Sequence, residues 1–156
     1  MVKSIDLPLS PNEHLRVSLS RPLKEKLNLL PRVKPETLAP NLELTMLDYD
    51  WEPGNTTLLE QIIILTLAKQ HQCKQVFEFG TFNGKTSAQL ALNLGKNVKI
   101  FTLDLPKGEI SQAKYHISSR DKVMVNKNEI GEKLAEVKGN ITQLYGDSAQ
   151  FDFTPY

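Results

Sequence analysis

The chain contains 156 residues, with 19 basic side chains, 18 acidic side chains and 40% hydrophobic residues. This length is typical of one domain, and the composition is that of a globular protein rather than of a disordered chain. A net charge of +1 gives no electrostatic argument for nucleic acid or an anionic membrane as a partner. The single cysteine, Cys73, excludes an internal disulfide framework and a cysteine-based zinc cluster.

The amino-terminal segment does not resemble a secretory signal, because Asp6 and two prolines interrupt any apolar core. The most apolar stretch, residues 58–68, is too short to span a bilayer and contains Glu60 and Gln61. The three histidines are far apart in the sequence and form no local metal-binding motif. We therefore expect a cytoplasmic protein with no membrane partner and no metal site.

Residues 1–50 differ from the rest of the chain, because they contain six of its nine prolines and no glycine. Proline fixes φ and removes a backbone donor, so only short helices are expected here, for example over residues 21–30. We predict an irregular, proline-rich arm over residues 1–50 that lies across a neighbouring surface. A substrate-facing cap or a dimerisation arm is the alternative.

A regular alternation of elements begins after Trp51. Thr57 and Glu60 match a capping box, which predicts a helix over residues 57–70, and its many apolar residues favour a largely buried position. Residues 75–79 are typical of a short strand. A second helix is predicted over residues 85–94, where a glycine at position 95 can end it.

A second strand is predicted over residues 98–103 and a third over residues 141–145. The polar stretch 107–127 between them shows no firm periodicity, so we interpret it as a solvated loop, with a lid that orders on ligand binding as the alternative. Helical spacing returns over residues 128–137. This alternation predicts an α/β fold, in which residues 51–156 form a parallel sheet with right-handed crossovers.

Each of the three predicted strands ends next to an acidic residue, namely Glu78, Asp104 or Asp147. In parallel α/β sheets, ligands bind beyond the carboxyl ends of the strands. The sequence therefore predicts a ligand site where these three strand ends meet.

The turn from Glu78 to Gly84 contains two glycines and leads from a strand into a helix, as several nucleotide-binding turns do. A dinucleotide fold requires Gly-x-Gly-x-x-Gly, but Phe82 stands at the central glycine. A phosphate-binding loop would use Gly84-Lys85-Thr86, but Phe79 stands where its first glycine should be. The acid-x-Gly-x-x-x-Gly pattern of an S-adenosylmethionine site fits without adjustment.

S-adenosylmethionine carries an ammonium and a sulfonium centre and no phosphate, so an acidic turn suits it better than it suits a pyrophosphate. Asp104 is placed to accept hydrogen bonds from both ribose hydroxyls, as an acid after the second strand does in dinucleotide folds. Asp147 can accept from the adenine amine, and the backbone N–H of Ser148 is close by in the sequence.

The segments VFEFGTFNGKTSAQLAL, IFTLDLP and ITQLYGDSAQFDFTPY together resemble the class I S-adenosylmethionine-dependent methyltransferases, and among these the small-molecule methyltransferases. The resemblance covers residues 51–156 and implies a Rossmann-like, three-layer fold. It implies methyl transfer from S-adenosylmethionine to a small-molecule acceptor, and it identifies no catalytic residue. The cofactor-binding residues that it implies are Glu78 and Gly80 beside the methionine part, Thr81 and Gly84 in the turn, Asp104 at the ribose, and Asp147 and Ser148 at the adenine.

Two other functions stay open. One is a non-catalytic module that binds S-adenosylmethionine or serves in interactions, and the other is a nucleotide-binding protein that uses Gly84-Lys85-Thr86.

The resemblance also predicts what the sheet contains. In the family, the first three strands have the order 3-2-1 and the fourth lies beside the first, whereas this sequence stops at Tyr156, before a fourth strand. We therefore expect a truncated methyltransferase, or a half-domain completed by another chain. Strand 75–79 would then be an exposed edge where a second copy or a completing chain associates. We expect the 156 residues alone to self-associate, to bind the cofactor weakly at best and to have no methyl-transfer activity.

Overall fold

The computed structural model describes residues 5–10, 13–17, 42–47, 52–125 and 130–156. Contacts divide the chain into two units, Met1–Pro40 and Asn41–Tyr156. The division falls before the predicted boundary at residue 50, because Leu44 and Met46 already pack against the core of the second unit.

In the first unit, β1 (Ile5–Ser10) pairs with β2 (Glu13–Val17) in an antiparallel hairpin. The predicted arm is therefore not irregular throughout. The pairing shifts register between Pro8 and Ser10. A proline is tolerated here because each strand of a two-stranded sheet has one unpaired edge. The helical turns predicted for residues 21–30 lie outside the described residues.

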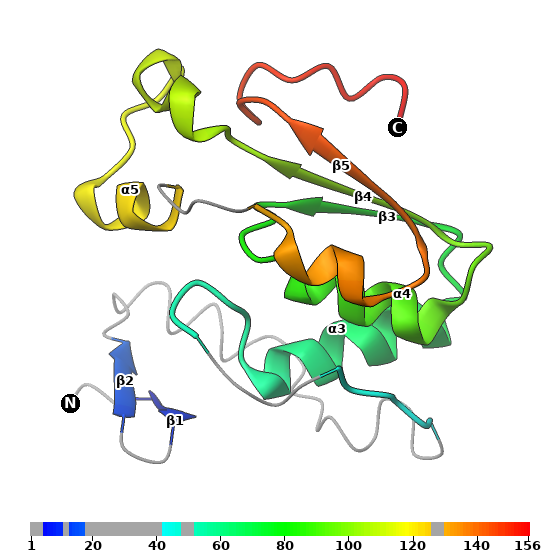
Figure 1. Ribbon diagram of the computed structural model, residues 1–156. Coiled ribbons are helices and arrows are strands. Elements are labelled where there is room, and N and C mark those ends of the chain that lie inside the picture. The colour runs from blue at the N-terminus through cyan, green and yellow to red at the C-terminus, as the bar shows by residue number, and fades with distance from the viewer. Residues whose placement is uncertain (1–4, 11–12, 18–41, 48–51, 126–129) are drawn as a thin grey trace, which may run out of the picture. The chain divides into compact units, whose positions relative to one another are not determined.

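In the second unit, three parallel strands form an open sheet with the order β3-β4-β5 (Figure 1). They are β3 (Gln75–Phe79), β4 (Lys99–Asp104) and β5 (Asn140–Tyr145). This arrangement confirms the predicted α/β fold with three parallel strands. Within the described residues, β3 lies at one edge of the sheet. The carboxyl ends of all three strands meet at the same end of the sheet.

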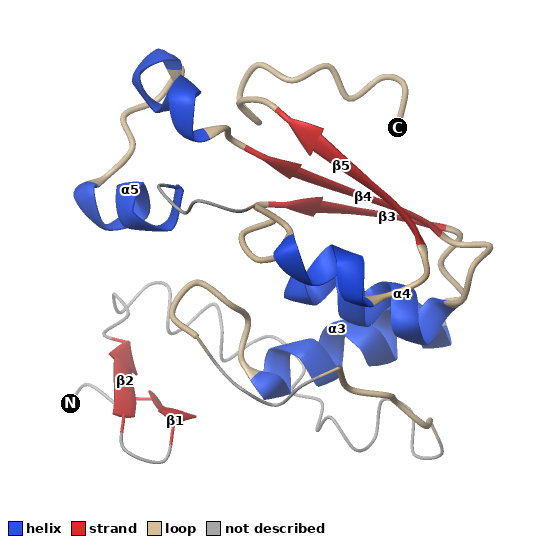
Figure 2. Ribbon diagram, viewed as in Figure 1, coloured by secondary structure: helices blue, strands red, loops and turns tan. Residues whose placement is uncertain are grey.

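The helices α3 (Leu58–Gln70) and α4 (Lys85–Leu94) and the 3-10 helix η2 (Glu132–Glu136) lie on one side of the sheet (Figures 1 and 2). The core forms where α3, α4 and β4 meet, and apolar side chains exclude water there. Its buried members are Leu65, Ala68, Leu90, Ala91, Val98 and Ile100.

The other side of the sheet carries aromatic side chains. Successive strand residues point to opposite faces, so Phe77 lies opposite the helix-facing Glu78. The carboxyl-terminal segment covers this side (Figure 1). The ring centroids of Phe153 and Phe77 lie 5.4 Å apart, and the ring centroids of Tyr156 and Phe101 lie 4.9 Å apart.

The predicted capping box of α3 is confirmed. The backbone N–H of Thr57 donates to Oε2 of Glu60 at 2.7 Å, and the backbone N–H of Glu60 donates to the Thr57 hydroxyl at 3.3 Å. The prediction that this helix is largely buried is wrong. Its Leu58, Leu59 and Leu67 side chains are exposed. Only one side of the helix packs against the rest of the protein, and that side includes the polar residue Gln61.

The stretch predicted to be a loop contains the 3-10 helix η1 (Lys107–Gln112) and the helix α5 (Ser119–Val125). The helix predicted over residues 128–137 is also wrong in type. In its described part, Gly131 has φ of +76°, and a 3-10 turn rather than an α-helix follows it. Within the described residues, no helix is long and apolar enough to cross a membrane.

Candidate functional site

A cavity of about 350 Å³ lies at the carboxyl ends of the three parallel strands. Its lining includes Gly80 after β3, Asp104 at the end of β4, and Asp147 and Ser148 after β5. The structure thus brings together four of the seven residues that the sequence predicted for a cofactor site. The volume lies within the range of about 300–1,000 Å³ that is usual for small-molecule sites.

The cavity walls are mostly apolar. Leu103 lies near the end of β4 and Leu105 directly follows that strand, whereas Ala113 and Ile117 lie between η1 and α5. Part of the stretch interpreted as a solvated loop therefore forms a wall of the cavity. A flat apolar ring could pack between these side chains, while the acidic groups meet its polar substituents.

Asp104 connects the cavity to the turn after β3. Its Oδ2 atom accepts a hydrogen bond from the backbone N–H of Phe82 at 2.7 Å, and its Oδ1 atom accepts from the backbone N–H of Leu105 at 2.8 Å. An ionised carboxylate offers about four acceptor positions. Asp104 can therefore fix the turn and still accept hydrogen bonds from a ligand.

Phe82 has a left-handed backbone with φ of +53°, which is rare for a bulky side chain. Its N–H is held by Asp104, and its carbonyl oxygen accepts from the N–H of Gly131 at 2.8 Å. Its ring lies so close to Gly54 that a Cβ atom added there would be 2.8 Å from it. Such strained residues persist only where their surroundings fix them, and they cluster at ligand sites.

Glu78 lies beneath the turn and does not line this cavity. Its Oε2 atom accepts from the hydroxyl of Ser87 at 2.6 Å and from that of Thr102 at 3.0 Å. Burial raises the pKa of this carboxyl; hydrogen bonds from neighbouring hydroxyls oppose that rise, and the charge of Asp104 adds to it. Contact between Glu78 and the methionine part of a cofactor stays a prediction.

Thr81 and Gly84 also shape the turn from below. The buried Thr81 hydroxyl lies 2.8 Å from that of Thr102 and accepts from Nε2 of Gln143 at 3.0 Å. Gly84 has φ of +86°, and a Cβ atom there would lie 2.8 Å from the side chain of Leu134. Only glycine adopts this conformation and leaves this space without strain.

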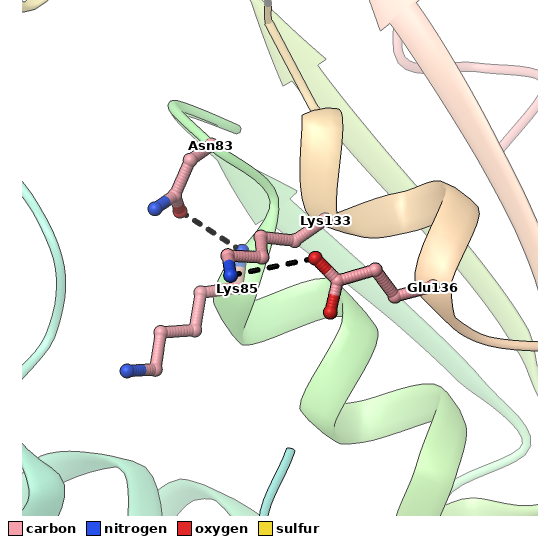
Figure 3. A network of polar contacts seen from close by, with 4 residues as sticks. All are labelled: Asn83, Lys85, Lys133 and Glu136. Atoms are coloured by element: carbon pink, nitrogen blue, oxygen red, sulfur yellow. Dashed lines mark hydrogen bonds and ion pairs between the residues drawn. The ribbon is translucent and has the colours of Figure 1, made fainter. Parts of the chain in front are cut away.

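The segment that carries η2 covers the same turn. The N–H of Lys133 donates to the carbonyl of Asn83 at 2.9 Å, and Lys133 forms an ion pair with Glu136 at 3.4 Å. Figure 3 shows the Lys85 side chain extending away from this pair. Lys85 is only 4% exposed, whereas a phosphate-binding loop presents its N–H groups and lysine to an open ligand site.

Asp147, which follows β5, forms a hydrogen bond with the segment around Lys114 that forms part of the cavity wall. Its Oδ2 atom accepts from the backbone N–H of Lys114 at 2.7 Å and from Nε2 of Gln150 at 3.1 Å, and its Oδ1 atom accepts from the N–H of Ala149 at 2.9 Å. These hydrogen bonds, that from Lys114 first, lower the pKa of the Asp147 carboxyl.

Sequence reasoning missed Asp121, which lies on α5 and lines the cavity. Ser118 and Asp121 have the spacing of a capping box, and this spacing could have predicted the start of a helix here. In the structure, the Asp121 N–H donates to the Ser118 hydroxyl at 3.2 Å, and that hydroxyl donates to the Asp121 carboxylate at 2.6 Å. Among the described residues, no group of three or more potential metal ligands is found.

A scan of the chain against protein-family models found no match, and a search of curated proteins found no match either. The chemistry of the cavity is therefore the basis for assigning a function.

Proposed function

We propose that this protein binds S-adenosylmethionine in the cavity at the carboxyl ends of the strands and serves in methyl transfer to a small-molecule acceptor. The observation that carries the proposal is the convergence of Gly80, Asp104 and Ser148 from three strand ends on one cavity of suitable volume. Ligands of parallel α/β sheets bind at this place.

The lining suits an adenosyl group. Asp104 has acceptor capacity left for the ribose hydroxyls, and Leu103, Leu105 and Ile117 offer apolar surface for a base. The carboxylates of Asp104 and Asp121 favour a cationic ligand over one that carries a pyrophosphate. When bound, the cofactor supplies a methyl group from its sulfonium centre, and the residues around the cavity position it for in-line transfer.

Two alternatives make different predictions. A non-catalytic module would transfer no methyl group even when a second chain completes the sheet. A nucleotide-binding protein that uses Gly84-Lys85-Thr86 would need an open turn, but η2 packs against that turn, as the bond from Lys133 to Asn83 shows.

Calorimetric titration of the full chain with S-adenosylmethionine, S-adenosylhomocysteine and magnesium-ATP tests the proposal. We expect binding of the two adenosyl ligands and none of magnesium-ATP. Binding of neither adenosyl ligand would contradict the proposal and favour a module that serves in interactions. Preference for magnesium-ATP would contradict the proposal and favour the phosphate-binding alternative.

A further inference from the structure

One hydrogen bond connects the wall of the cavity to the sheet across a long stretch of sequence. The backbone N–H of Lys114 donates to Oδ2 of Asp147 at 2.7 Å. Lys114 lies within residues 113–117, which we call the wall segment. Four of its members, Ala113, Tyr115, His116 and Ile117, line the cavity.

The remaining acceptor positions of Asp147 are largely used as well. With the bonds from Lys114 and Gln150, Oδ2 has both lone pairs engaged, and Oδ1 accepts from Ala149. Because three of about four acceptor positions serve the protein itself, the carboxylate is built chiefly to hold its surroundings.

We propose that Asp147 is a positioning residue, which holds the wall segment against the cavity and thereby sets the affinity for an adenosyl ligand without recognising its base. This inference rests on the proposed function and refines it, because the sequence had suggested direct contact between Asp147 and the adenine amine.

The backbone of Lys114, not its side chain, makes the contact. The Lys114 ammonium instead lies 5.5 Å from the centre of the Tyr115 ring. Lys114→Ala therefore keeps the bond to Asp147, whereas Lys114→Pro removes the donor. The preceding residue, Ala113, has φ of −59° and ψ of 137°, a conformation that a following proline permits. The two variants form a matched pair.

Hydrogen exchange in the free protein tests the holding role without any ligand. We expect the Lys114 amide to exchange at least about tenfold faster in Asp147→Ala than in the unchanged protein, because the hydrogen bond that protects it is lost. Asp152→Ala is the control, since that carboxylate accepts from the N–H and the hydroxyl of Thr154. Equal exchange of Lys114 in Asp147→Ala and the unchanged protein would overturn the proposal.

Binding of two ligands separates positioning from direct recognition. S-adenosylhomocysteine carries the adenine amine, and S-inosylhomocysteine carries a carbonyl oxygen in its place. We expect Asp147→Ala and Lys114→Pro to weaken both ligands by the same factor, at least about tenfold, and Lys114→Ala to weaken them far less, because it keeps the backbone donor.

A different pattern would overturn the proposal. If Asp147→Ala abolished the preference between the two ligands while Lys114→Pro left both affinities unchanged, Asp147 would recognise the base directly. If the unchanged protein bound neither ligand, the proposed function would fail, while the exchange of Lys114 would still decide whether Asp147 holds the wall segment.

Discussion

The backbone N–H of Phe82 lies 2.7 Å from Oδ2 of Asp104, so the strained turn after β3 is fixed by the acidic residue that ends β4. The bond joins two neighbouring strand ends at the edge of the cavity. A change at Asp104 therefore affects the shape of the turn. It also affects the binding of any ligand that donates hydrogen bonds to the same carboxylate.

We expect Asp104→Ala to weaken the binding of S-adenosylhomocysteine by about 1–3 kcal/mol, which is the scale of lost hydrogen bonds to a charged acceptor. It should also lower the free energy of unfolding, because Phe82 loses its partner. Calorimetry and urea denaturation measure the two effects. Asp152→Ala is the control, and an affinity unchanged by Asp104→Ala would contradict the ribose assignment.

Glu78 should make stability fall with rising pH. Its folded pKa lies above the ordinary value of 4.5, so between these two pKa values the folded state holds more protons than the unfolded state. The free energy of unfolding therefore decreases as pH rises through that window, by at most about 1.4 kcal/mol per pH unit for one group.

Replacing this carboxyl by an uncharged amide tests that expectation. Glu78→Gln should show a smaller decrease than the unchanged protein when both are denatured with urea at a series of pH values above 4.5. The hydroxyls of Ser87 and Thr102 can both donate and accept, so they can pair with the amide. Identical pH profiles for the two proteins would show that burial does not raise the pKa of Glu78.

Gly84→Ala should destabilise the protein by about 1–3 kcal/mol, because the new Cβ would need a left-handed backbone and would clash with Leu134. Gly108→Ala is the matched control, because nothing lies within 4 Å of a Cβ atom there. Thermal denaturation followed by circular dichroism measures both. Equal stability of the two variants would show that the turn relaxes around the added methyl group.

Thr57→Ala should lower the free energy of unfolding by about 1 kcal/mol, because the start of α3 loses a side-chain cap for the Glu60 N–H. Thr57→Ser keeps the hydroxyl and should be nearly neutral. Urea denaturation of both variants tests this, and a loss of equal size in the serine variant would point to packing rather than capping.

Association through β3 is also testable. Phe79 is 64% exposed and ends the strand at the edge of the described sheet. Edge strands with apolar, exposed side chains favour pairing between molecules, and lysine discourages it. We expect light scattering to detect self-association that Phe79→Lys reduces, whereas a stable monomer before the substitution would contradict this prediction.

The sequence predicted the elements whose signals are local. The capping pair Thr57 and Glu60 marked the start of α3, and the limits of β3 and α4 agree with the prediction because turn residues bound both elements. The convergence of Asp104 and Asp147 also followed from a general property of parallel sheets, since their strand ends meet at one edge.

The contacts between distant segments could not be predicted. The periodicity of residues 128–137 indicated a helix, but Gly131 adopts a left-handed backbone whose N–H bonds to Phe82, and this tertiary contact overrides the local pattern. Likewise, nothing in the sequence showed that Asp147 would accept from a backbone N–H as distant as that of Lys114. Such contacts determine which carboxylate oxygens can still accept a hydrogen bond from a ligand.

The side-chain amide of Asn93 pairs with both backbone polar groups of Thr45, as a residue of an adjacent β-strand would. Its Oδ1 atom accepts from the N–H of Thr45 at 2.8 Å, and its Nδ2 group donates to the carbonyl of the same residue at 2.8 Å. This amide anchors the segment that brings Leu44 and Met46 to the core. A shortened chain beginning at Trp51 would lack Leu44 and Met46 and would expose the part of the core that they cover. A protease-resistant fragment should therefore retain the residues from Leu42 onward.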